Sequence, residues 1–162
     1  MYIIGQALEE LFKRENWNYQ KRSDRTYYFG FRGESNRFDF WAIIHEKGDI
    51  LTIYAIVPIL VPDEKKPVIY DFLHRANYDL MLGNFEIDGR DGEIRYKVSQ
   101  DFCNTTPSLE ILDRMIDCAL SMVDRYNEGI GAILFGNVSA EEAIEIIESD
   151  LGPREERSSI VQ

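Results

Sequence analysis

Three carboxylates around one glycine turn have the residue types for binding a divalent cation. Asp88, Asp91 and Glu93 flank Gly89 and Gly92, and carboxylate oxygens are the ligands that calcium and magnesium prefer. Their order differs from that of an EF-hand loop, and aspartate and glycine are also the residues that a tight hairpin selects for its backbone. We therefore interpret this segment as a turn and expect no metal and no cofactor.

Other patterns that could carry catalysis are equally sparse. The two histidines, His45 and His74, have no partner at metal-ligand spacing. No serine lies in a G-x-S-x-G turn, and Gly129-Ile130-Gly131 lacks the glycine and lysine of a phosphate-binding loop. We expect that the protein is not an enzyme, because hydrolase or transferase chemistry would have only the carboxylate turn in its favour.

The two cysteines also favour structure over chemistry. Cys103 and Cys118 form no CxxC motif and match no zinc spacing. Cys118 falls in an apolar helical stripe and Cys103 follows Phe102 at a strand end, so both thiols are expected to be buried and inert. Unpaired cysteines fit a reducing compartment, and we expect a cytoplasmic protein.

Size and charge limit the organisation and the partners. The 162 residues are 44% hydrophobic, enough for a single core, which we assign to residues 1–150. Residues 151–162 lack an apolar period and are expected to form a disordered tail. With 18 basic and 29 acidic residues the net charge is -11, so neither nucleic acid nor a membrane surface is an expected partner.

Apolar spacing predicts where the helices and strands lie. Alternation with period two predicts five strands in one antiparallel sheet, the first three contiguous. Helical spacing predicts helices that begin near Ile3, Asp63, Thr106 and Ser139. Thr106 is expected to cap the longest helix, and Ser139 to open a capping box. Three glycines predict a bend or break in the longest helix, at Gly129, Gly131 and Gly136. The predicted core comprises Phe38, Phe40, Leu51, Ile53, Phe72, Leu73, Phe85, Ile94, Leu112 and Ile116.

The chain also carries more apolar surface than one core requires. Four residues alternate out of phase with the core positions of two strands: Trp41, Ile43, Tyr54 and Ile56. A second helical stripe includes Ile111, Met115 and Met122. Such faces must be covered by a helix of the same chain, by a second copy or by a ligand. We predict that one or both sets form an interface in a homodimer, and cover by the chain's own helices is the competing interpretation.

Several motifs together resemble the YbjN-like family of bacterial proteins. They are Ala76-Asn77-Tyr78, Gly83-Asn84-Phe85-Glu86-Ile87-Asp88, Asp91-Gly92-Glu93-Ile94-Arg95-Tyr96, Pro58 with Pro62, Asp124-Arg125-Tyr126, and Ser139-Ala140-Glu141-Glu142-Ala143. The resemblance implies an α+β fold similar to type III secretion chaperones, with five antiparallel strands, flanking helices and the order α-β-β-β-α-β-β-α(α).

The resemblance also implies a function. Proteins of that fold usually dimerise and bind extended segments of partner proteins, and the family is described as a sensory or stress-response regulator. We expect a homodimeric, non-enzymatic module that binds an unidentified protein or peptide segment in a chaperone-like or regulatory role. The alternative is a small-molecule sensor with a pocket between the helices and the sheet.

Overall fold

A computed structural model of the chain describes residues 2–47 and 49–151. The expected tail therefore lies outside the described residues, apart from Leu151. The elements along the chain are α1 (Ile3–Arg14), β1 (Tyr19–Ser23), β2 (Thr26–Arg32), β3 (Arg37–Ile44), β4 (Ile50–Leu60), the short 3-10 helix η1 (Asp63–Lys65), α2 (Lys66–Asn77), β5 (Asn84–Ile87), β6 (Glu93–Asp101), α3 (Leu109–Gly136) and α4 (Ala140–Glu148). The predicted α+β class with an antiparallel sheet and flanking helices is confirmed.

The sheet has six strands in the order β1-β2-β3-β4-β6-β5, so the prediction of five was wrong. The additional strand is β1, which pairs antiparallel with β2. All five of its residues are exposed, and Gln20, Lys21 and Arg22 give it no alternation of apolar and polar positions. Because periodicity detects a strand through its buried face, a wet strand at the sheet edge leaves no such signal.

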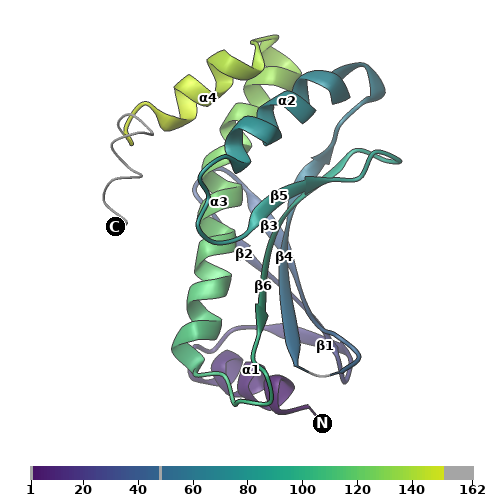
Figure 1. The fold of residues 1–162 in the computed structure, drawn as a ribbon, viewed down its shortest axis with the longest axis vertical. Helices are drawn as coiled ribbons and strands as arrows, with labels where there is room; N and C mark the ends of the chain where they lie inside the picture. The colour runs from purple at the N-terminus through teal and green to yellow at the C-terminus, as the bar shows by residue number, and fades with distance from the viewer. Residues whose placement is uncertain (1, 48, 152–162) are drawn as a thin grey trace.

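The helices lie on one face of the sheet and beyond its ends. α3 runs along the face, α1 lies near one end of it, and α2 and α4 pack around the other end (Figure 1). α3 is capped by Ser108, whose hydroxyl accepts a hydrogen bond from the Ile111 N–H at 3.2 Å, rather than by Thr106 as expected. The predicted capping box at Ser139 is confirmed, because Ser139 and Glu142 bond to each other's backbone N–H.

The three glycines do not break α3, which runs without interruption for 28 residues. Gly129 instead permits close packing. A Cβ atom at this position would lie 2.7 Å from Cζ of Phe72 on α2 and 3.0 Å from the Ile147 side chain on α4. Glycine is therefore needed here for the approach of two helices and not for flexibility.

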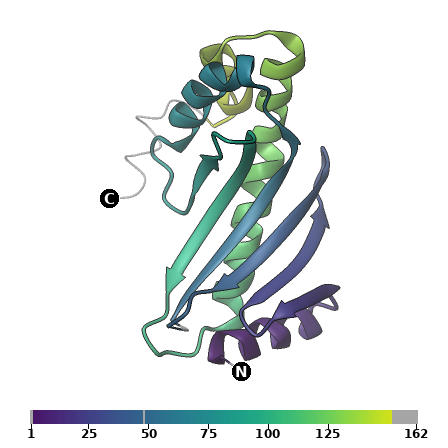
Figure 2. The same cartoon turned by 90° about the vertical axis from the view of Figure 1, so that its right-hand side faces the viewer.

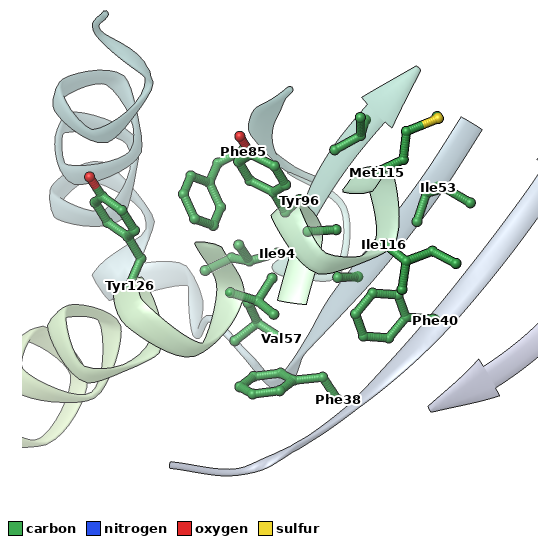
Figure 3. Packing of buried hydrophobic residues seen from close by; sticks show 14 of the residues in the cluster. Phe38, Phe40, Ile53, Val57, Phe85, Ile94, Tyr96, Met115, Ile116 and Tyr126 are labelled. Carbon is green, nitrogen blue, oxygen red and sulfur yellow. The ribbon is translucent and has the colours of Figure 1, made fainter. Parts of the chain in front are cut away.

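Side chains fill the layer between α3 and the sheet. Met115 and Ile116 of α3 lie among residues of β3, β4 and β6, including Phe40, Ile53 and Tyr96 (Figure 3). All ten residues of the predicted core are buried. The core thus occupies one side of the sheet.

Candidate functional site

The second face of the sheet is not crossed by any helix of the described residues, as Figure 2 shows with α3 behind the strands. Trp41 and Ile43 on β3 and Tyr54 and Ile56 on β4 lie on this side, each half-buried. Trp41 is directly opposite Tyr54 in the register. We call this side, centred on these four residues, the open face. Cover by a helix of the same chain is therefore not found within residues 2–47 and 49–151.

Aromatic and charged side chains continue the apolar centre across neighbouring strands. The Tyr28 and Trp41 rings are 5.1 Å apart between centroids. On the other flank, the Arg95 guanidinium carbon lies 4.1 Å from the Tyr54 ring centroid, a cation–π contact. An apolar centre with a polar border is the arrangement of protein interfaces.

Glu86 organises that charged border. Its carboxylate accepts a hydrogen bond from Nε of Arg95 at 2.8 Å and from Nζ of Lys97 at 2.5 Å. Burial acts to raise the pKa of Glu86, but the bonds from Lys97 and Arg95 outweigh it and hold the pKa below its usual value. The network fixes the guanidinium over Tyr54. The alternation of Arg95 and Lys97 with Ile94 and Tyr96 is visible in the sequence, but the pairing of β6 with β4 is not.

A polar chain lies at one end of the open face. His45 Nε2 is 2.9 Å from the Thr52 hydroxyl, which is 2.8 Å from the Ser99 hydroxyl. These contacts supply partners for the buried Thr52 side chain. In the described part of the chain, no group of three or more histidine, cysteine or acidic residues is arranged to hold a metal ion.

The second predicted surface does not form one exposed stripe. Ile111 is 47% exposed, whereas Met115 is only 6% exposed and belongs to the core (Figure 3). Met122 is half-buried against the core. α3 has neighbours on two sides, since the loop before β5 also approaches it, with the Leu82 carbonyl 3.9 Å from Sγ of Cys118. Of this set, Ile111 alone is well exposed.

The carboxylates of the glycine turn serve the turn itself. Asp88 forms an ion pair with Arg90 at 2.7 Å, and the bonds from the Arg90 side chain and backbone lower the pKa of Asp88 to about 2. Asp91 Oδ1 accepts the N–H of Glu93 at 2.9 Å. Gly92 has a φ of 80°, and a Cβ there would lie 2.2 Å from the Val61 carbonyl oxygen. These contacts agree with our interpretation of the segment as a turn.

The two cysteines differ from each other. Cys118 is half-buried, and this burial raises the pKa of its thiol. Cys103 is exposed, contrary to the expectation that it is buried. It lies in the turn after β6 with a φ of 45°, and its N–H donates to Asp101. A residue in such a tight turn leaves the sheet, so its side chain does not continue the buried face of β6.

Comparison with known proteins gives a family and a fold. Residues 5–132 match the YbjN family, described as a "putative bacterial sensory transduction regulator". A solved chain from the "Structure of the HopA1-SchA Chaperone-Effector Complex" is similar in fold, with a TM-score of 0.50 and 12% sequence identity. The match covers 76% of this chain and 91% of that one. At this identity the similarity concerns the fold alone.

One comparison with known proteins and one search of the helices give negative results. No curated protein matches the chain in sequence. Among the described residues, no helix combines the length and the apolar character needed to cross a membrane.

Proposed function

We propose, from the premise that the chain belongs to the YbjN family, that it is a non-enzymatic protein-binding module with a chaperone-like or regulatory role. It acts in the cytoplasm as a homodimer, and the open face is the surface where two copies meet. The observation that carries this proposal is the half-buried apolar centre formed by Trp41, Ile43, Tyr54 and Ile56, with no helix of the described residues across it.

Charge favours a second copy as the occupant of the open face. The chain as a whole carries a net charge of -11. Strand alternation places cations and carboxylates in near balance on this face: Arg22, Arg32, Arg37, Arg95 and Lys97 against Asp39, Glu86, Glu93 and Asp101. Two copies can therefore meet here without the repulsion that the acidic remainder of their surfaces would cause.

The dimensions of the open face are also adequate. Six strands have five spacings of about 4.8 Å and a mean length of about seven residues, which gives a sheet area on the order of 600 Å². A standard interface uses roughly 800 Å² of each partner. A pairing of two open faces, with their side chains interlocked, approaches that size.

The packed core supports protein binding over small-molecule sensing. A sensor pocket between helices and sheet would need space where Met115, Ile116 and their neighbours on the strands are in contact. The sensor alternative therefore has less support than a surface that binds protein.

Two copies with different affinity tags, expressed in one cell, test the proposal. Capture through one tag should recover the other copy together with any further bound protein. Trp41→Asp in both copies should abolish recovery of the second copy, because it would bury two carboxylates at the centre of the contact. Ile111→Asp, on the exposed part of α3, is the matched control and should not. Failure of the wild-type pair to associate would contradict the proposal.

A further inference from the structure

The edge of β2 is only partly covered by β1. The pairing reaches Tyr19 of β1 opposite Phe29 of β2, and β2 continues to Arg32. Beyond that point is a hollow of about 480 Å³ whose walls include Trp17, Tyr28 and Arg37. We call this hollow, together with the strand edge from Gly30 to Arg32, the edge notch.

Among residues 2–47 and 49–151, backbone groups of the edge notch that point away from β3 have no backbone partner. The Gly33 N–H donates to the Asn36 carbonyl at 2.8 Å, which closes the β2–β3 hairpin. Opposed residues in antiparallel strands alternate between bonded and non-bonded pairs. Arg32, paired with Arg37, is therefore in a non-bonded pair, and its N–H and C=O point away from β3 towards the free edge.

The opposite edge of the sheet is closed by a side chain. Asn77, the last residue of α2, accepts the N–H of Phe85 on β5 at 2.7 Å through Oδ1, and its Nδ2 donates to the Phe85 carbonyl at 3.0 Å. This amide occupies the outward-facing backbone groups of Phe85. At Phe85, therefore, β5 has no outward-facing backbone groups left for strand addition, whereas Arg32 of β2 keeps such groups.

Cations outnumber carboxylates beside the edge notch, where Arg32 and Arg37 lie with Asp39, whose Oδ1 would be 3.6 Å from a Cβ on Gly30. Arg32 and Arg37 are direct cross-strand neighbours, and like charges in that position repel each other. Neither forms an ion pair within residues 2–47 and 49–151. Arg37 extends across β2, since a Cβ on Gly30 would be 3.3 Å from its Nη2 atom. Its guanidinium thus lies over the strand whose edge is free.

We propose that the edge notch binds an extended, acidic segment of a partner protein. The segment pairs with the backbone from Gly30 to Arg32, a length of about 10 Å, and its carboxylates neutralise Arg32 and Arg37. This inference rests on the proposed protein-binding function and adds the class of partner. An exposed backbone edge favours a polypeptide over a nucleic acid, because a strand supplies both the donors and the acceptors that pair with it.

The two tryptophans report on the edge notch and on the adjoining open face, because Trp41 is 5.1 Å from the Tyr28 ring on the notch wall. Trp17 lines the edge notch and Trp41 lies on the open face. In a Trp41→Phe variant, emission therefore reports on Trp17, and in a Trp17→Phe variant it reports on Trp41. The probe is a synthetic peptide in which glutamate alternates with valine. We expect saturable changes in Trp17 emission, and no change with matched peptides that carry lysine for glutamate or a central proline, which cannot pair as a strand.

Charge variants complete the experiment. Arg32→Gln with Arg37→Gln should weaken binding of the acidic peptide by about tenfold or more, whereas Arg114→Gln on α3 should leave it unchanged. No binding by wild-type protein, equal binding by the double variant, or displacement by an oligonucleotide of equal charge would overturn the inference. A response of Trp41 alone would also overturn it while leaving the open face as the protein-binding surface. Because Arg32 and Arg37 also lie on the open face, dimerisation of the wild type and of the double variant is measured separately, and the wild-type result decides the proposed function.

Discussion

Asp124 on α3 accepts hydrogen bonds from the backbone N–H of Ser35 at 3.0 Å and from its hydroxyl at 2.7 Å. The same carboxylate accepts the N–H of Glu34 at 2.8 Å. A Cβ on Gly33 would lie 2.5 Å from Cγ of Asp124, so the hairpin approaches the helix as closely as a glycine allows. This contact fixes the β2–β3 hairpin, and with it Arg32 and Arg37, against α3.

We predict that Asp124→Asn destabilises the fold by roughly 1 to 3 kcal/mol at neutral pH, since charge-assisted bonds to Glu34 and Ser35 are lost. Burial acts to raise the pKa of Asp124, but these bonds outweigh it and lower the pKa. The folded pKa is therefore below the unfolded value of about 3.9. The stabilisation is present above that value and is lost as the pH falls through the folded pKa. Urea unfolding at several pH values checks this: the difference between wild type and variant should shrink in acid, and an equal difference at every pH would contradict it.

Two glycines of α3 should respond to alanine with opposite signs. Gly129→Ala places a methyl group against Phe72 and Ile147 and should cost about 1 to 3 kcal/mol of stability. Gly131 has open space around its Cα, so Gly131→Ala should stabilise the protein by up to about 1 kcal/mol through helix propensity. Thermal unfolding of the two variants measures both changes. A stabilised Gly129→Ala would show that α2 and α4 pack less closely on α3 than the structure indicates.

The thiols should react at different rates. Cys103 is exposed, whereas Cys118 is half-buried with a raised pKa, so its thiolate form is scarcer. A chromogenic disulfide reagent should modify one thiol quickly and the other slowly. Cys103→Ser should remove the fast phase and Cys118→Ser should retain it. Loss of the fast phase in Cys118→Ser instead would contradict the exposure of Cys103.

Calcium and magnesium should not stabilise the protein through the glycine turn. Asp88 is engaged by Arg90, and Asp91 by the Glu93 N–H. A cation that bound only the folded state would raise the melting temperature by mass action. We expect an unchanged melting temperature at millimolar concentrations of either ion. A saturable rise that disappears in Asp91→Ala would establish a cation site instead.

Local patterns in the sequence predicted most helices and strands, because an element buried on one side has apolar residues at regular spacing. Phe38 and Phe40 alternate on β3, and the Ser139 capping box marks the start of α4. β1 has no buried side and left no such signal. Long-range pairing was also beyond local pattern: the contact of Arg95 with Tyr54 requires β6 to lie beside β4.

Of the candidate surfaces, the open face could be predicted from local spacing, whereas the surroundings of α3 and the edge notch depend on long-range contacts. Alternation showed that Trp41 and Tyr54 face away from the core, whichever element covers them. Whether Met115 is buried or exposed depends on the loop before β5 and on the strands around α3. Sequence spacing does not specify where these segments lie. The edge notch exists because β1 stops pairing at Phe29 while β2 continues, and no residue pattern records that difference.

Sedimentation equilibrium across a range of concentrations tests most directly the claim that the open face joins two copies. Wild-type protein at tens of micromolar should be a dimer, with somewhat tighter association at higher salt because the net charge of -11 per chain is screened. Trp41→Asp should be a folded monomer by circular dichroism, and Ile111→Asp should remain a dimer. A wild-type monomer in moderate salt, or a dimer unaffected by both Trp41→Asp and Ile56→Asp, would contradict the claim.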